Sequence, residues 1–216
     1  MDKTFEFQTI DTDGIGFLAK LEESDLYYGL SVPCGDLYEA EELFVDGGKF
    51  DSNRLVFVCF EENRVYEPLK AEKGSYFERP VCIEEVIYLL RVDFIKHKIA
   101  IYAWQKGQTS VEEIVLLDLD IVKDCYNLRL IKSPLTLVRS GHENLFQILW
   151  PEKAEFAISP RESLDHREGE LLLFSMWHED PDYREEVIVR DLTDGKILER
   201  HDGFIYRING KEYIVR

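Results

Sequence analysis

The amino-acid sequence predicts an all-β protein. Three observations support this. Short runs rich in Val, Ile, Leu, Tyr and Phe follow one another along most of the 216 residues. Polar or glycine-containing segments of the kind found in turns separate these runs. No long stretch keeps a 3.6-residue apolar period, which argues against alternating strands and helices and against a nucleotide site in a parallel sheet.

The expected strands occur from the first quarter of the chain to its end. The clearest candidates are residues 54–60, 86–94, 98–104, 113–119, 128–132, 171–177 and 187–192. The tail predicts a hairpin with strands at 204–208 and 211–215, because Asn209-Gly210 between them can supply the positive φ angles of a two-residue turn. Asp194-Gly195 offers the same turn chemistry.

One segment, residues 36–44, has two possible structures. Asp36 and Glu39 have the spacing of a capping box, in which each side chain accepts a hydrogen bond from the other residue's backbone N–H. That spacing predicts a helix of two turns. The same stretch could instead end in a strand, and the sequence leaves both structures open.

The composition is acidic. Lys and Arg number 26 and Asp and Glu number 43, so the formal net charge is −17. A charge this negative argues against a nucleic-acid backbone or an anionic membrane as the partner. The acidic residues are dispersed along the chain, which is typical of a solubility surface. The alternative is an acidic face that binds a basic protein.

The four cysteines and the start of the chain predict a cytoplasmic protein. No Cys-x-x-Cys pair is present, and Cys59 and Cys82 lie in apolar runs, so we expect buried, reduced thiols. Cys34 follows a proline in an expected turn and is the candidate for a reactive thiol. The first 14 residues lack the apolar segment of a signal peptide, and no apolar run is long enough to span a bilayer.

An internal repeat is visible when the sequence is shifted by 73 residues, the distance from Trp104 to Trp177 (177 − 104 = 73). The shift aligns residues 99–123 with residues 172–196. Each copy has a strand ending in Trp, a polar loop, and a second strand that ends in Asp-Leu. We therefore predict one domain, residues 1–216, built from similar β units.

The second copy carries a family resemblance. Residues 186–196 (EVIVRDLTDGK) resemble the third strand and following turn of a propeller blade, as found in WD-repeat proteins. Residues 113–120 repeat the strand without the Gly turn, and the Trp-Asp and Gly-His pairs of WD repeats are not in register. The resemblance implies a small propeller-like array of antiparallel sheets. A β-sandwich is the alternative.

Five residues are candidate ligand-binding residues: Trp104, Trp177, His178, Glu179 and Asp180. An aromatic side chain beside a histidine and carboxylates can bind a sugar or a cationic group, or supply an acid–base pair. The loop after Trp104 lacks the histidine and the carboxylates, so a solvated acidic loop after Trp177 is the alternative to a site. Packing at the strand ends is the expected role of both tryptophans.

The remaining histidines and carboxylates indicate no metal site and no cofactor. No histidine pair has the spacing of a helical zinc motif. Asp165-His166 and His201-Asp202 are adjacent pairs, and neighbours on a strand point to opposite faces, so adjacency alone does not make a dyad.

The sequence supports two function classes. The first is a module that binds a protein or a small-molecule ligand. The second is a hydrolase or lyase that acts on carbohydrate through His178 and nearby carboxylates. Both occur on propellers and sandwiches, so the fold does not choose between them, and enzyme activity stays open. The sequence does not indicate the oligomeric state or the identity of a partner.

Overall fold

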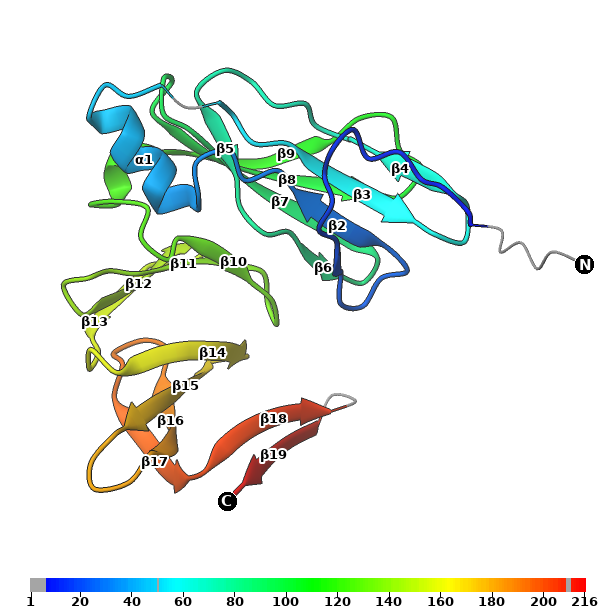
Figure 1. Cartoon of the computed structure of the whole chain (residues 1–216). Helices are drawn as coiled ribbons and strands as arrows, with labels where there is room; N and C mark the ends of the chain where they lie inside the picture. The colour runs from blue at the N-terminus through cyan, green and yellow to red at the C-terminus, as the bar shows by residue number, and fades with distance from the viewer. Residues whose placement is uncertain (1–6, 50, 209–210) are drawn as a thin grey trace, which may run out of the picture. The chain divides into compact units, whose positions relative to one another are not determined.

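The structure is a computed structural model that describes residues 7–49, 51–208 and 211–216. Its elements are β-strands apart from one α-helix and one 3-10 turn (Figure 1). The chain divides into two compact units, Met1–Leu119 and Asp120–Arg216. Each unit is described by itself. No helix among the described residues is long and apolar enough to cross a membrane.

The first unit contains two antiparallel sheets. One has the strand order β1-β2-β3-β4, and the other has the order β5-β7-β8-β9 with β6 paired to β7. The strands are β1 (Ala19–Lys20), β2 (Tyr27–Leu30), β3 (Leu55–Cys59), β4 (Arg64–Tyr66), β5 (Ser75–Phe77), β6 (Val81–Ile83), β7 (Val86–Asp93), β8 (Lys98–Gln105) and β9 (Glu112–Asp118).

The core of the first unit lies where these two sheets face each other. Phe57 on β3 and Trp104 on β8 are almost fully buried, and their rings stack with centroids 5.3 Å apart. Aromatic side chains bury the largest apolar area per residue, so this contact is a main stabilising feature of the unit.

The helix α1 (Leu37–Val45) resolves the open choice at residues 36–44. The Glu39 backbone N–H donates to Asp36 Oδ1 at 2.9 Å, and the Asp36 N–H donates to Glu39 Oε2 at 2.8 Å. This is the capping box that the sequence predicts. Leu37 and Ala40 are the buried residues of the helix.

The second unit contains two four-stranded antiparallel sheets and a hairpin. The sheet orders are β10-β11-β12-β13 and β14-β15-β16-β17, and β18 pairs with β19. The 3-10 turn η1 (Leu119–Ile121) precedes them. The strands are β10 (Arg129–Ile131), β11 (Thr136–Ser140), β12 (Leu145–Trp150), β13 (Ala154–Ala157), β14 (Glu162–Glu168), β15 (Leu171–His178), β16 (Arg184–Asp191), β17 (Ile197–Asp202), β18 (Phe204–Ile208) and β19 (Lys211–Val215).

The core of the second unit also joins two sheets. Phe146 and Phe156 from one sheet pack with Phe174 and Ile188 from the other. Arg139 on β11 of the same unit is fully buried. Its guanidinium donates hydrogen bonds to the carboxylates of Asp124 and Glu143. The pKa of Glu143 falls to about 2, chiefly because its carboxylate accepts a hydrogen bond from the Arg139 guanidinium.

These sheets confirm the all-β prediction and its propeller-like array. Each four-stranded sheet is a meander of consecutive strands, which is the arrangement of a propeller blade. Gly195 has a φ of +69°, so it supplies the positive backbone angle expected of the Asp194-Gly195 turn. The predicted Asn209-Gly210 turn lies outside the described residues. The single domain 1–216 stays a prediction.

The two copies of the sequence repeat share a register and differ in sheet position. Lys98 pairs with Asp118, and Leu171, which is 73 residues after Lys98, pairs with Asp191 in the same way. However, β8 and β9 are the last two strands of their sheet, whereas β15 and β16 are the middle two of theirs. The tryptophans also differ, because Trp104 is 1% exposed and Trp177 is 38% exposed. A shared origin of the two segments stays a prediction.

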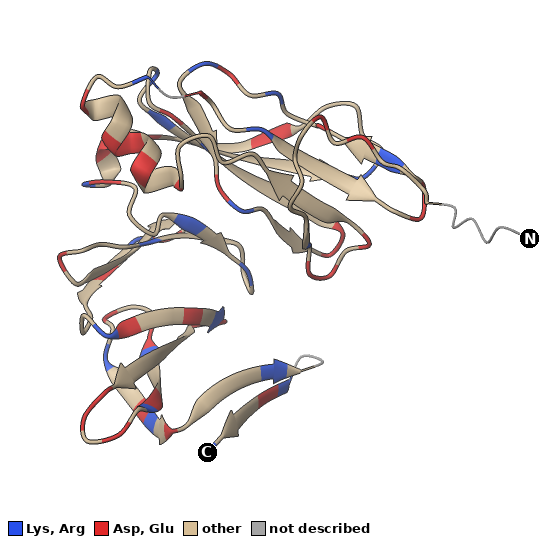
Figure 2. Cartoon of the chain, viewed as in Figure 1, with Lys and Arg blue, Asp and Glu red and all other residues tan. Residues whose placement is uncertain are grey.

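The cysteines are free thiols as the sequence predicts, but the structure does not favour a reactive thiol at Cys34. Cys59 and Cys82 are buried, and all four cysteines are free thiols. Burial raises the pKa of Cys34 above its ordinary value, which lowers its thiolate fraction and disfavours the reactivity that the sequence suggested. Acidic residues occur on α1, on loops and on strands of both units (Figure 2). A basic protein partner stays a prediction.

Candidate functional site: an exposed aromatic surface

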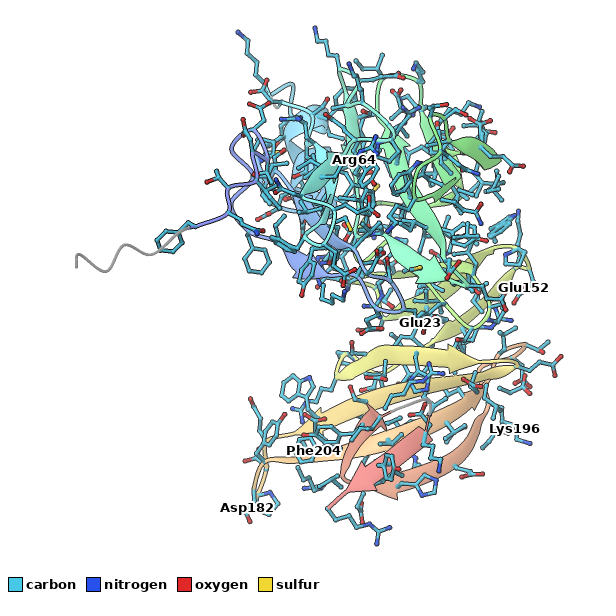
Figure 3. All side chains as sticks on the ribbon, turned by 90° about the vertical axis from the view of Figure 1, so that its right-hand side faces the viewer. Glu23, Arg64, Glu152, Asp182, Lys196 and Phe204 are labelled. Carbon is cyan, nitrogen blue, oxygen red and sulfur yellow. The ribbon has the colours of Figure 1, made fainter. Side chains whose placement is uncertain are left out.

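The structure separates the five candidate residues into three surroundings. Trp104 is part of the core of the first unit. Trp177 and His178 end strand β15 in the second unit, and Glu179 and Asp180 begin the loop that follows it. Figure 3 shows this loop at Asp182, at one end of the sheet. The Trp104 side chain therefore serves packing.

The His178 side chain contacts a residue of its own sheet and not the carboxylates of the loop that follows it. Its Nε2 lies 3.2 Å from Glu186 Oε1 on β16. The other carboxylate oxygen of Glu186 pairs with Arg200 on β17 at 2.9 Å. Glu179 and Asp180 are exposed, and within the described residues their carboxylates make no ion pair. The three side chains of the predicted acid–base group thus do not converge.

Trp177 belongs to a different group of side chains. It stands opposite Glu185 on β16, so the two residues share one face of the sheet. The Arg161 guanidinium lies 5.1 Å from the centre of the indole. The Tyr183 hydroxyl donates to Glu185 Oε1 at 2.5 Å, and this hydrogen bond raises the pKa of Tyr183. The Tyr183 ring lies 6.5 Å from the ring of Phe204, so the group reaches strand β18.

The hairpin β18–β19 continues this group with a row of apolar side chains. Phe204, Tyr206 and Ile208 alternate along β18, so they point to one face. Phe204 pairs with Val215 and Tyr206 with Tyr213, which places the partners on the same face. We call the following set the aromatic surface: Trp177, Tyr183, Phe204, Tyr206, Ile208, Tyr213 and Val215. Their exposed fractions range from 38% to 61%.

The other face of the hairpin is attached to the sheet β14–β17. Glu212 on β19 lies 3.2 Å from His166 Nε2, and Arg207 on β18 lies 3.4 Å from Glu168. The Gly203 N–H donates to the Glu185 carbonyl at 2.8 Å, and β18 contacts β16. Gly203 has a φ of +120°, and a Cβ there would lie 2.4 Å from the Val215 carbonyl oxygen. Only glycine fits this junction.

The contact of His166 corrects one sequence expectation. The sequence placed Asp165 and His166 on opposite faces of a strand. In the structure His166 Nδ1 lies 2.6 Å from Asp165 Oδ2. The register of β14 against β15 shifts between Leu164 and His166, and such a bulge turns two successive side chains towards one side.

The sequence predicted both hairpin strands but not the open face of the hairpin. A signal was present. Apolar residues occupy both alternating positions in residues 204–208 and 213–215. Such a pattern is typical of a strand covered on both faces. In the structure one face of the hairpin contacts the sheet β14–β17 and leaves Ile214 38% exposed, and the other face is open. The same pattern occurs in buried strands, so the sequence alone could not separate the two cases.

A second cluster of polar side chains lies in the first unit. Ligand atoms of Asp25, Cys59 and Glu62 are within 4.8 Å of one another. The Lys106 ammonium lies 2.5 Å from Asp25 and 2.9 Å from Glu62 and therefore compensates both charges. The hydrogen bond from Lys106 is the main cause that lowers the pKa of Asp25. The hydrogen bond from the Tyr66 hydroxyl is the main cause that lowers the pKa of Glu62. This cluster is a closed ion-pair network.

The first unit also has a concave region of about 340 Å³. The residues that form it are Gln8, Ile10, Thr12, Ile15, Gly16, Leu18 and Phe60. None of these side chains titrates or binds metals strongly, so the region offers apolar contact without acid–base chemistry.

Comparisons with known proteins found no matching protein-family model and no matching curated protein. Among solved structures, the chain resembles the beta-propeller domain of the Trilobed protease from Pyrococcus furiosus, with 14% identity and a TM-score of 0.45 over 90% of this chain and 61% of that one. It also resembles prolyl oligopeptidase B from Galerina marginata, with 10% identity and a TM-score of 0.42 over 90% of this chain and 29% of that one.

The blade-like sheets place the chain in the class of β-propeller-like proteins. The chain spans about three fifths of the first structure's length and less than a third of the second's.

Proposed function

We propose that this chain is a protein-binding module and that the aromatic surface is its binding site. One observation carries the proposal. Seven large apolar side chains at one end of β15, in the following loop and on the hairpin are exposed on the second unit, and the rings of Tyr183 and Phe204 join the loop to the hairpin. Contiguous apolar surface of this kind is rare on soluble domains and usually marks an interaction site.

The chemistry of the surface supports a protein partner. Tyr and Trp are enriched among the residues that dominate binding at protein interfaces, because their rings bury a large area and their polar atoms still form hydrogen bonds. Lys211 is the one charged residue on the open face among the described residues of the two strands. A depletion of charge at the centre is typical of protein interfaces.

The alternative, a hydrolase or lyase on carbohydrate, gains no support from the arrangement of His178. That side chain pairs with Glu186, and the carboxylates of Glu179 and Asp180 are exposed and apart from it. A kinship with WD-repeat propellers and a cytoplasmic location remain parts of our proposal. The Asp-Leu and Gly-Lys pattern of residues 186–196 supports the first. Four free cysteines support the second.

Site-specific photo-crosslinking tests the proposed function. A photoreactive phenylalanine analogue replaces Tyr206 in the full chain, and the matched control replaces Leu116 on β9, which is 49% exposed. After irradiation in cells of the source organism, we expect protein adducts from position 206 and few from position 116. Equal or absent adducts at the two positions would contradict the proposal.

A further inference from the structure

The open face of the hairpin β18–β19 lacks a layer that other apolar strands of the chain have. All five residues of β3 are buried, and β8 is buried on both faces. Strand β18 also carries apolar residues on both faces, but Tyr206 is 51% exposed and Ile208 is 53% exposed. Exposed apolar patches of this kind mark interaction sites, so the open face is a candidate docking surface.

We propose that a second copy of this chain covers this face, with the two aromatic surfaces packed against each other about a twofold axis. This inference rests on the proposed function and names its partner. In the dimer, each hairpin lies between its own sheet β14–β17 and the hairpin of the other copy, so the two hairpins form the two layers of a β-sandwich.

The area of the surface fits a dimer of this kind. From their exposed fractions, the side chains of the aromatic surface expose about 600 Å² on one copy, and two copies together bury about 1,200 Å², the lower limit of a stable interface. A two-stranded hairpin is marginally stable by itself, so the added layer also stabilises the segment that forms it.

The open face of the hairpin is the part of the surface where charge repulsion between two copies is weakest. The chain has a net charge of −17, so two copies repel each other over most of their surface. Residues 204–216 carry Arg207, Lys211, Arg216 and a single acid, Glu212. Arg207 and Glu212 lie on the face that contacts the sheet β14–β17 and pair with each other. The open face therefore has no carboxylate to select a basic protein, and its uncharged centre lets two acidic chains approach.

Self-complementarity adds to this argument. In a twofold interface the same patch of each copy contacts that patch of the other copy, so the patch must be complementary to itself. Tyr206 and Tyr213 are paired neighbours on the open face, and a tyrosine offers an apolar ring and a hydroxyl that both donates and accepts a hydrogen bond. Two such pairs can satisfy each other without a buried charge.

Light scattering on a sizing column tests the dimer with the full chain. At concentrations from about 1 µM to about 100 µM, we expect the mass to rise from 25.4 kDa towards twice that value. The double variant Tyr206→Lys/Tyr213→Lys introduces charges that repel across the twofold axis, and we expect it to stay monomeric. The control Ile114→Lys/Leu116→Lys changes exposed residues on β9, and we expect it to dimerise like the wild type. A monomeric wild type, or a dimer that survives the tyrosine changes, would overturn the inference.

A crosslink keeps the inference testable if the double variant misfolds. Isotopically light and heavy copies of the chain are mixed, both with the photoreactive residue at position 206. We expect light–heavy peptide pairs that join the two hairpins. If position 206 yields adducts with another protein in cells and no light–heavy pairs, the dimer is refuted while the proposed function stands. If it yields neither, both fail.

Discussion

The hairpins β8–β9 and β15–β16 have similar sequences and different surroundings. Both contain a strand with apolar residues at both alternating positions, a Trp near its end, and a partner strand that ends in Asp-Leu. Trp104 on β8 stacks on Phe57 and is 1% exposed. Trp177 on β15 lies beside Arg161 and is 38% exposed.

The difference arises from the layer that faces each tryptophan. The face of β8 that carries Trp104 packs against the four-stranded sheet β1–β4, which brings Phe57 and Leu55 into contact with it. On the corresponding face of β15, the attached layer is a hairpin of two strands, and Leu171 and Trp177 at the two ends of β15 remain partly exposed. The sequence of a strand thus determines its extended structure and pairing, whereas the adjoining layer determines its burial.

The largest expected effect comes from removing the two tryptophans one at a time. Trp104→Ala leaves a cavity between two sheets, and we expect it to lower the free energy of unfolding by about 3–5 kcal/mol. Trp177→Ala removes a ring with one open side, and we expect a loss below about 1 kcal/mol in a monomeric state. Chemical denaturation monitored by circular dichroism at low protein concentration checks both. Equal losses would show that the open surface of Trp177 is covered in solution.

A second test concerns the buried arginine of β16. Arg190 takes the position that Leu117 has in β9, since 190 − 73 = 117, and it pairs with Glu162, whose side chain is 1% exposed. Arg190→Leu leaves that carboxylate buried without its cation, so we expect a loss of about 3–5 kcal/mol in the free energy of unfolding.

The control for this test is the double variant Arg190→Leu/Glu162→Leu. It removes both charges, and replacement of a whole buried ion pair by apolar residues is often neutral. We therefore expect it to recover most of the stability in the same denaturation experiment. A double variant as unstable as the single one would show that the hydrogen bond from Arg190 to the Gly195 carbonyl, at 2.6 Å, carries the effect instead.

Much of this fold could be predicted from the sequence because strands and turns have local signals. The runs of Val, Ile and aromatic residues predicted the positions of β7, β8, β15 and the final hairpin. The spacing of Asp36 and Glu39 indicated the cap of α1, which is also a local feature. The sheet positions of β8 and β15 depend on distant strands, and the repeat alone could not reveal that these positions differ.

The candidate site was predictable only in part. The sequence indicates Trp177 because it is an aromatic residue beside a histidine and two carboxylates, and the structure leaves it 38% exposed at the end of β15. Its neighbours there, Tyr183 and Phe204, come from a loop and from a later strand, and their proximity is a tertiary contact. His178 was selected for its neighbours in sequence, but its contact is Glu186 across the strand pair. Cross-strand pairing requires the register, which the sequence did not supply.

The smallest expected effect is the difference in unfolding free energy between removing the hydroxyl of Tyr102 and removing that of Tyr183, both of which form hydrogen bonds. Tyr102 lies on the Trp104 face of β8, is 6% exposed, and accepts a hydrogen bond from Arg91 Nη2 at 2.7 Å. Tyr102→Phe leaves this buried donor without its acceptor, so we expect a loss of about 1–2 kcal/mol in the free energy of unfolding. Tyr183→Phe removes a hydrogen bond at a side chain that is 61% exposed, and we expect a change within about 0.5 kcal/mol.

The pH dependence of stability sharpens this last comparison. Burial raises the pKa of Tyr102 above its ordinary value near 10, so the unfolded chain loses this proton at a lower pH than the folded chain does. The stability that Tyr102 contributes is therefore complete below about pH 10 and declines as the pH rises through the folded value. Denaturation curves between about pH 8 and pH 11 should decline less steeply for Tyr102→Phe than for the wild type. Equal slopes would mean that the Tyr102 hydroxyl is open to water, and the contrast between the two faces would then lie in Trp104 alone.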